Sequence, residues 1–314
     1  MDPISEGKFT DAIYNCFDNS TVIMIARRLS NIKDFDNIFV LDNGEIVESG
    51  THIELMKIYY VQKSSKIKQR GMIMGNRLYL KEVRLTRCTS NDNYWCRLPF
   101  YKVLSRGVSI PFSCPVTFIV GENGCGKSTL IEAIAVAMGY NAEGGSKNFT
   151  FNTRDTTSIL CDELQIVKTG YEKDGFFLRA ESFYNFATNI EELKLNIDNY
   201  GGKSLHDQSH GESFLALIQN RFRGKGLYIL DEPESALSPM RQMTLLLEIN
   251  ELVSKDSQFL IATHSPILMA YPNSDIYSLD NGINKVKYNE TEHYNIMRYF
   301  LNNPDGAINK LFNQ

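Results

Sequence analysis

Several features that would assign the chain to a membrane, secreted or metal-binding class are missing from the sequence. No apolar run approaches the roughly 18 residues of a transmembrane helix, so we expect no transmembrane segment. The first residues, MDPISEGK, contain neither a basic nor an apolar stretch, so we expect no signal peptide. The six cysteines form no CxxC pair, which argues against a zinc or disulfide framework. These absences predict a cytoplasmic protein.

A large excess of one charge is also missing. The chain has 33 Lys and Arg against 37 Asp and Glu, a formal net charge of −4. This balance argues against a surface that coats nucleic acid generally, although it leaves room for a local basic patch. With 314 residues, 43% hydrophobic and 22% charged, the composition is typical of a soluble globular protein of one large or two ordinary domains.

Short apolar runs rich in β-branched residues predict buried parallel strands. The runs lie at 21–26, 116–120, 227–230 and 259–262. Segments with helical periodicity separate the last three runs, for example MRQMTLLLEINELVSK after the third. This alternation predicts an α/β fold with a mainly parallel sheet and flanking helices.

A basic stretch, QKSSKIKQR at 62–70, separates two parts of different character. We interpret residues 58–75 as a solvated linker, with a phosphate-contacting patch as the alternative. The parts share a partial repeat, because 20–50 parallels 257–286. In both copies a strand leads to Leu-Asp-Asn-Gly, with the Asp-Asn-Gly turns at 42–44 and 280–282, which predicts a small antiparallel hairpin in each.

The sharpest motif is GENGCGKS at 121–128, which fits G-x-x-x-x-G-K-[ST] without a mismatch. It follows the strand VTFIV and precedes the helical run TLIEAIAVAM, which is the context of a phosphate-binding P-loop. Its glycines allow backbone N–H groups to converge on phosphate oxygens. We expect Lys127 to contact the β- and γ-phosphates of ATP and to act in catalysis, and Ser128 to bind Mg²⁺. The predicted binding residues are Gly121, Glu122, Asn123, Gly124, Cys125, Gly126, Lys127, Ser128 and Thr129.

Two further motifs follow buried strands. GLYILDEPE at 226–234 places Asp231 at the end of a strand, where we expect it to bind Mg²⁺, usually through water. Glu232 is the predicted general base that positions water for attack on the γ-phosphate. His264, in IATHSP, follows the next strand and is predicted to sense the γ-phosphate, with a structural role as the alternative.

A fourth element is SHGES at 209–213, which leads into the helical run FLALIQNRF. Ser209, Gly211 and the start of this helix would form an anion-binding cap. The plain alternative is an ordinary helix N-cap.

The four elements, in this order, resemble the ABC-type ATPases over about 76–314. SHGES departs from the transporter signature LSGGQ but keeps its Ser-X-Gly core. Together with DEPESALSP and ATHSP, it makes the chain look more like the soluble AAA/SMC/RecF-like branch than a transporter subunit. The resemblance implies a P-loop NTPase fold and a homodimer that forms head to tail on ATP binding. Ser209 and Gly211 of one subunit would then cap the γ-phosphate held by Lys127 of the other.

Some features of the family have no clear counterpart in the sequence. Gln165 is a candidate for the glutamine that follows the P-loop helix, and Arg154 for a phosphate-contacting arginine. The aromatic residues ahead of the P-loop strand, among which no adenine platform is evident, are Tyr94, Trp95, Phe100 and Tyr101.

The stretch TVIMIARRLSNIKDFDNIFVLDNGEIVESGTHIELM lies within residues 1–57. Through it, residues 1–57 resemble the C-terminal part of an ABC exporter nucleotide-binding domain. Its P-loop, signature and acidic strand are missing, and Arg27 stands where that family has its switch histidine. Arginine neither gives up a proton at neutral pH nor accepts a hydrogen bond. We therefore interpret 1–57 as a remnant without ATPase activity, followed by the linker 58–75 and a complete ATPase domain at 76–314.

The leading hypothesis is an ATPase that converts ATP and water to ADP and phosphate, with Mg²⁺, and dimerises on ATP binding, acting on DNA in repair or defence. The alternative is an ATP-binding subunit that energises a membrane permease. A third hypothesis, a scaffold that binds ATP without turnover, is disfavoured because Lys127, Asp231, Glu232 and His264 are all in place.

Overall fold

The computed structural model describes residues 23, 36–42, 45–51, 54–55, 78–86, 93–147, 160–183, 188 and 209–312. The chain divides into two compact units, Met1–Gly75 and Asn76–Gln314. The division falls at the end of the predicted linker 58–75, whose own assignment, like that of the remnant 1–57, stays a prediction.

The second unit holds the larger set of elements. Its strands are β3 (Leu80–Leu85), β4 (Ile110–Pro111), β5 (Val116–Val120), β6 (Leu164–Lys168), β7 (Asp174–Arg179), β8 (Gly226–Asp231), β9 (Gln258–Ala262), β10 (Asp275–Ser278) and β11 (Asn284–Lys285). Its α-helices are α3 (Pro99–Leu104), α4 (Lys127–Ala137), α5 (Leu160–Glu163), α7 (His210–Arg221), α8 (Pro239–Ser254), α9 (Pro266–Met269), α10 (Glu292–Asn302) and α11 (Pro304–Phe312). Short 3-10 turns are η2 (Tyr94–Arg97), η5 (Pro233–Ala236) and η6 (Tyr288–Glu290).

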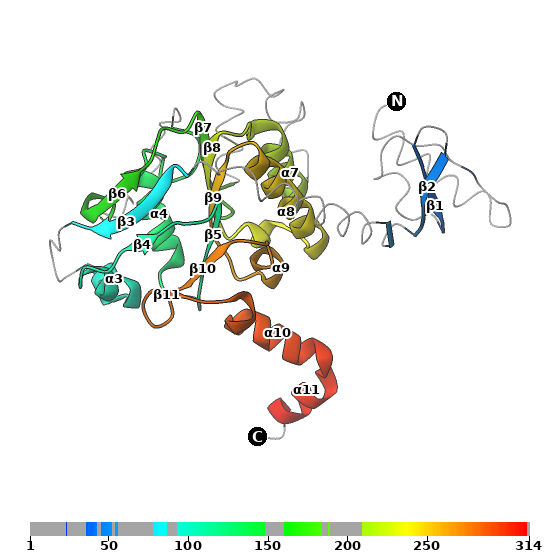
Figure 1. The fold of residues 1–314 in the computed structure, drawn as a ribbon. Helices are drawn as coiled ribbons and strands as arrows, with labels where there is room; N and C mark the ends of the chain where they lie inside the picture. Colours follow the sequence, from blue (N-terminus) through cyan, green and yellow to red (C-terminus); the bar gives the residue numbers. More distant parts are fainter. Residues whose placement is uncertain are drawn as a thin grey trace. The chain divides into compact units, whose positions relative to one another are not determined.

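The central sheet has the strand order β11-β10-β5-β9-β8-β7 (Figure 1). Its strands from β10 to β7 are parallel, and β11 pairs antiparallel with β10 at the edge. A second, antiparallel sheet has the order β4-β3-β6. Every residue of β5, β8 and β9 is buried, as in parallel strands covered on both faces. The predicted α/β class with a mainly parallel sheet and a small antiparallel part is confirmed.

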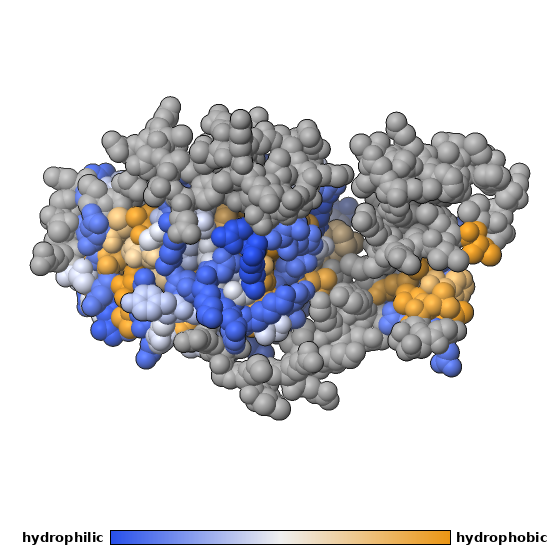
Figure 2. All heavy atoms as spheres, turned by 90° about the horizontal axis from the view of Figure 1, so that it is seen from above, coloured by the Kyte–Doolittle hydropathy of each residue, from blue (hydrophilic) through white to orange (hydrophobic). Residues whose placement is uncertain are grey.

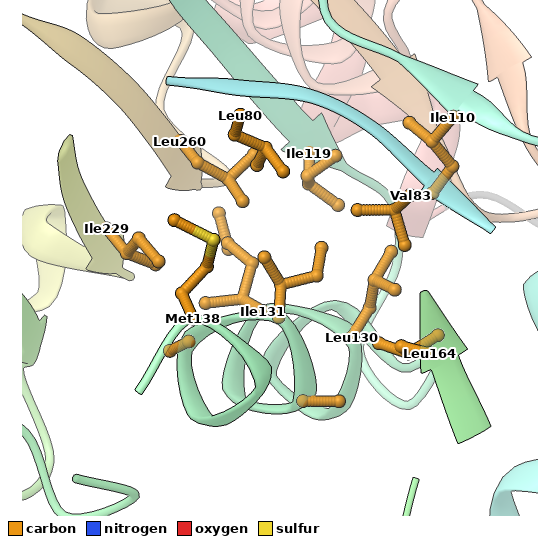
Figure 3. Packing of buried hydrophobic residues seen from close by; sticks show 14 of the residues in the cluster. Leu80, Val83, Ile110, Ile119, Leu130, Ile131, Met138, Leu164, Ile229 and Leu260 are labelled. Atoms are coloured by element: carbon orange, nitrogen blue, oxygen red, sulfur yellow. The ribbon is translucent and has the colours of Figure 1, made fainter. Parts of the chain in front are cut away.

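Alternate residues of the parallel strands point to opposite faces of the central sheet. Tyr228 and Leu230 pack with residues of α7 and α8 on one face, whereas Leu227 and Ile229 pack with α4 on the other. Figure 3 shows this second face, where apolar side chains of α4 meet those of the central sheet and of β3 and β4. The two apolar layers pack on the two faces of the sheet that contains β5, β8 and β9, and the site lies at one edge of this sheet.

The two copies of the predicted hairpin both form, but in different surroundings. In the first unit β1 (Ile38–Asp42) pairs antiparallel with β2 (Glu45–Gly50), and in the second β10 pairs with β11. β10 is also joined to β5, whereas apolar residues of the first hairpin, such as Phe39 and Leu41, are exposed. Figure 2 shows apolar surface on this unit. The buried strand predicted at 21–26 does not hold at Ile23, which is 88% exposed and in no strand. Among the described residues of the first unit, no third strand covers the β1–β2 hairpin. The other positions of 21–26 lie outside the described residues.

The helices of the second unit are of moderate length, and α8, with 16 residues, is the longest among the described ones. Throughout the part of the chain that the structure describes, no helix is long and apolar enough to cross a membrane. At the C-terminal end, α10 and α11 leave several apolar side chains exposed, including Ile296, Phe300 and Leu311.

Candidate functional site

The carboxyl ends of three neighbouring strands carry the predicted site residues. β5, β9 and β8 are adjacent and parallel, and their register places Ile119 beside Ala262 and Ala262 beside Asp231. The glycine-rich loop follows β5, His264 follows β9 and Glu232 follows β8. Residues far apart in sequence are thus brought to one edge of the sheet, where open α/β sheets bind ligands.

The glycine-rich loop needs glycine at two crowded positions. Gly121 has φ +145° and Gly126 has φ +98°, both in the region that residues with a Cβ rarely adopt. A Cβ at Gly126 would lie 2.6 Å from Cε1 of Phe100, and one at Gly121 would lie 2.7 Å from Oδ1 of Asp280. The loop is therefore packed from both sides, by α3 and by the turn after β10.

Lys127 and Ser128 begin α4 and point into the site. The buried Lys127 ammonium donates to the carbonyl oxygens of Gly121 at 2.9 Å and Glu122 at 3.2 Å. The Ser128 hydroxyl donates to Oδ1 of Asp231 at 3.1 Å. The structure therefore brings together the two residues predicted to bind Mg²⁺, although they come from different strand–helix units.

The other loop residues have distinct environments. The Glu122 N–H donates to Oδ1 of Asp280 at 2.6 Å, while Asn123 and Gly124 are exposed. Burial raises the pKa of the Cys125 thiol. Thr129 lies 3.3 Å, oxygen to oxygen, from the hydroxyl of Tyr94.

Asp231 is a buried carboxylate beside a cation that the sequence did not suggest. Burial raises the pKa of Asp231 to about 6, against the opposing effect of Arg179 and of the Ser128 hydrogen bond. Arg179 ends β7, directly opposite Asp231 in the register, with its Nε 3.5 Å from Oδ2. Its Nη1 also forms a 2.7 Å ion pair with Glu132 of α4. Arg179 thus links the Asp231 strand to the P-loop helix.

Glu232 has an unusual backbone. Its φ and ψ are 49° and 51°, the left-handed region that residues other than glycine seldom occupy. Its N–H donates to the carbonyl of Ala262 at 3.0 Å, and its Oε1 lies 3.4 Å from Nε2 of His264. The strained turn directs the carboxylate toward His264, which follows β9.

His264 has partners on three sides. Its main-chain N–H donates to the carboxylate of Glu234, whose pKa is raised by burial. Its Nε2 faces Glu232, and its Nδ1 is 2.7 Å from Nε2 of His293 on α10. Burial lowers the pKa of His264, and Lys127 and His293 act in the same direction. Sequence analysis missed Glu234 and His293; the first lies within DEPE, but no local pattern indicates the second.

Ser209 and Gly211 lie at the start of α7. The Ser209 N–H donates to Glu212 at 3.2 Å, and Arg241 of α8 donates to the Ser209 hydroxyl at 3.2 Å and to Glu212 at 2.9 Å. A Cβ at Gly211 would lie 2.7 Å from the carbonyl oxygen of Ala236. Among the described contacts of Ser209, none reaches the glycine-rich loop of the same chain.

The structure reduces the number of candidates for the adenine platform and for the glutamine that follows the P-loop helix. Trp95, Phe100 and Tyr101 are buried, which leaves Tyr94, 58% exposed and next to Thr129, as the aromatic residue that a ligand base could reach. Gln165 is exposed on β6, and no described contact joins it to the site. Arg27 and Arg154 lie outside the described residues.

The strand–loop–helix with its glycine-rich turn, together with Ser128, Asp231, Glu232 and His264 at one edge of a parallel sheet, defines a P-loop ATPase of the ABC type. The chain belongs to the AAA domain family, whose model matches residues 99–275, more than half of the chain. The match confirms the predicted resemblance to the AAA/SMC/RecF-like branch of the ABC-type ATPases.

Short stretches of the chain are similar to ABC transporters. The chain is 48% identical over 56 residues to an ATP-dependent lipid A-core flippase of Idiomarina loihiensis, which covers 18% of this chain and 10% of the relative. It is 63% identical over 43 residues to the multidrug resistance-like ATP-binding protein MdlB of Buchnera aphidicola, covering 13% and 7%. The chain therefore spans a tenth or less of the length of these relatives.

Solved structures similar to this chain include an SMC head domain and an ABC transporter component. The SMC head domain from Thermotoga maritima is 18% identical, with a TM-score of 0.37, over 67% of this chain and 100% of that domain. The ABC transporter component cbiO1 from Clostridium perfringens is 16% identical, with a TM-score of 0.41, over 76% of this chain and 100% of cbiO1.

Proposed function

We propose that the unit 76–314 binds ATP with Mg²⁺ and hydrolyses it to ADP and phosphate. The observation that carries the proposal is the 3.1 Å hydrogen bond from Ser128 to Asp231, with Glu232 and His264 at the same sheet edge. P-loop NTPases bind their metal with this pair of residues. A chance glycine-rich turn would not bring a matching carboxylate and a polar pair to its side.

The residues present fit Mg²⁺ and a triphosphate. Mg²⁺ prefers oxygen ligands and is usually held by one or two carboxylates together with substrate phosphates and water. Ser128 and Asp231 supply such oxygens, and the described residues contain no cluster of three His, Cys, Asp or Glu side chains that would hold a metal alone. When bound, the metal would neutralise charge on the phosphates. Lys127, now on the carbonyls of Gly121 and Glu122, would turn to the β- and γ-phosphates.

Glu232 and His264 supply the polar groups for attack on the γ-phosphate. In this proposal the Glu232 carboxylate accepts a proton from water and orients it in line with the phosphorus–oxygen bond that breaks. His264, 3.4 Å from that carboxylate, donates from Nε2 to the γ-phosphate. Asp231 holds the metal side of the site, and Arg179 fixes Asp231 against β7.

The finer part of the proposal is a homodimer formed head to tail on ATP binding. Ser209 and Gly211 would complete the site of the partner by capping its γ-phosphate at the start of α7. In support, the described contacts of Ser209 go to residues of α7 and to Arg241 of α8, and none reaches the glycine-rich loop of the same chain. DNA is the proposed stimulating partner, in repair or defence.

The second candidate is an ATP-binding subunit that drives a membrane permease. The observation in its favour is the similarity to a lipid A-core flippase at 48% identity. That match spans only 56 residues, whereas the family model covers 99–275. We therefore prefer the first function; recovery of a permease in a membrane pull-down would reverse this order.

Steady-state ATP turnover of the purified protein, with and without linear duplex DNA, tests the proposal. Lys127→Ala is the blank, because the loop cation balances several phosphate charges and its loss should abolish ATP binding. Turnover by the wild type and none by the variant supports the ATPase, and stimulation by DNA supports the DNA partner. Retained micromolar ATP binding by Lys127→Ala would contradict the P-loop assignment.

A further inference from the structure

His293 lies outside every motif that the sequence indicated, yet its ring touches the site. Its Nε2 is 2.7 Å from Nδ1 of His264, and the two ring centroids are 4.7 Å apart at an interplanar angle of 64°. The residue sits in the first turn of α10, 29 residues after His264. A contact this short between two ring nitrogens requires one proton between them.

We propose that His293 is a positioning residue, which donates from Nε2–H to Nδ1 of His264 and so holds His264 as the Nε2–H tautomer. The inference rests on the proposed function in one respect, the role of His264 as a donor to the γ-phosphate. A neutral imidazole carries one N–H, and which nitrogen carries it is set by the partner of the other nitrogen. For His264 the partner of Nδ1 is His293, and the carboxylate of Glu232 lies beside Nε2 on the other side of the ring.

The opposite arrangement conflicts with the other side of the His264 ring. If Nδ1 of His264 carried the proton and donated to His293, its Nε2 would present a lone pair. That lone pair would face Oε1 of Glu232 at 3.4 Å, so two acceptors would meet without a proton between them. With the proton on Nε2, the same contact becomes attractive.

The surroundings of His264 favour its neutral form, which makes the choice of tautomer matter. Burial lowers the pKa of His264, and the Lys127 ammonium and His293 lower it further, against the carboxylates of Glu232 and Glu122. A neutral ring can donate to a phosphate only from the nitrogen that is protonated. The wrong tautomer would place a lone pair against the γ-phosphate oxygens and repel them.

The start of α10 is held in place, so the ring of His293 has a defined position. Tyr288, just before the helix, packs against the buried core, and the buried N-cap residue Thr291 donates from its hydroxyl to the carbonyl of Tyr288 at 2.8 Å. Asn295 donates to the carbonyls of Asn289 and Thr291. The rest of α10 has exposed apolar residues such as Leu301, so the helix is fixed chiefly at the end that carries His293.

Two substitutions separate the hydrogen bond from the volume of the ring. His293→Leu removes the donor and keeps an apolar side chain of similar reach, whereas His293→Gln keeps an N–H donor near the position of Nε2. Leu301→Ala, on the exposed part of α10, is the matched control for a change in this helix. The protein has only five histidines, so the imidazole ¹⁵N signals are few, and His264→Asn identifies those of His264.

Imidazole ¹⁵N NMR of the nucleotide-free full chain reads the tautomer without any catalysis. We expect His264 to show the neutral Nε2–H pattern in the wild type, in His293→Gln and in Leu301→Ala, and a mixture of tautomers in His293→Leu. An Nδ1–H pattern in the wild type, or an unchanged Nε2–H pattern in His293→Leu, would overturn the proposal. Because this assay needs no ATP, it gives an answer even if the proposed ATPase function is wrong.

Steady-state ATP turnover is the second test of the role of His293. Loss of the hydrogen-bond partner that orients a metal-binding histidine typically costs about 10- to 100-fold, and we take the same range for His264. We expect a loss of that size in kcat, at nearly constant KM, for His293→Leu, with most of the activity kept by His293→Gln. Equal losses in the Leu and Gln variants would show that the ring only fills space, and a change confined to KM would place His293 in ATP binding instead.

Discussion

The left-handed backbone of Glu232 allows its chemical role and its structural cost to be measured apart. Glu232→Gln keeps the backbone, the length and the polarity of the side chain but cannot accept a proton at neutral pH. General acid–base catalysis contributes about 10²- to 10⁴-fold, so we expect kcat to fall by at least about 100-fold. The loop, Lys127 and Ser128 are untouched, so ATP binding should persist and an ATP-bound dimer should accumulate.

Glu232→Gly removes the same carboxylate and also the Cβ that makes φ +49° costly. A residue with a Cβ in the left-handed region costs about 1–2 kcal/mol. Part of the stability gained by relieving this strain is offset, because the greater freedom of glycine in the unfolded chain costs about 0.5–1 kcal/mol. The net expectation is a gain of roughly 0.5–1 kcal/mol, which corresponds to about 1–4 °C in Tm for a unit of this size. The glycine variant should thus be inactive yet more stable.

Thermal unfolding of the wild type, Glu232→Gln and Glu232→Gly, followed without nucleotide, measures the strain. Glutamine has the same Cβ, so its Tm should match that of the wild type, and this variant is the control for loss of charge. A glycine variant no more stable than the glutamine variant would refute the strain. Wild-type turnover by Glu232→Gln would refute its role as the base, whatever the melting temperatures show.

Two further substitutions test the packing around the site. Gly211→Ala should lower the stability by about 1–3 kcal/mol, because the added Cβ would lie 2.7 Å from the Ala236 carbonyl oxygen. Thermal unfolding measures this loss, with Asn220→Ala, at an exposed position of the same helix, as the control. An unchanged Tm for Gly211→Ala would show that α7 moves freely away from η5. Asp280→Ala removes the acceptor of the Glu122 N–H, a bond of about 1.5–3 kcal/mol for a charged acceptor, and should raise the KM for ATP. Asp280→Asn keeps an acceptor and should retain a KM near that of the wild type, so equal effects of Ala and Asn would contradict a bracing role.

Local patterns predicted the elements that are defined by their own neighbours in sequence. The strand VTFIV, the glycine-rich loop and the helix after it form one continuous strand–turn–helix, and the structure places β5 at the predicted 116–120. Asp231 and Glu232 were predictable for the same reason, since an apolar strand ends in two acids. Parallel pairing then brings these ends together, so the edge that holds the predicted residues follows from strand order alone.

The residues that the sequence did not suggest act across large separations in the chain. Arg179 reaches Asp231 because β7 pairs with β8, and Asp280 reaches the glycine-rich loop because β10 pairs with β5. His293 reaches His264 because α10 packs against α9, the helix that begins just after His264. Arg179 and His293 belong to no motif, and Asp280 belongs to a turn motif that indicates a hairpin and not a contact with the glycine-rich loop. Only the packing of the finished fold brings these three residues to the site.

The repeated hairpin shows how far a motif depends on its setting. Asp42 and Asp280 occupy the same place in the two Leu-Asp-Asn-Gly copies, and both copies form an antiparallel hairpin. Asp280 accepts a hydrogen bond from the glycine-rich loop because β10 lies beside the strand that carries the loop. Asp42 pairs with Glu45 across the hairpin, and the sequence of the first unit contains no glycine-rich phosphate-binding motif for it to brace. The same four residues thus support a nucleotide site only where β5 stands next to them, which is why we assign the ATPase to 76–314 alone.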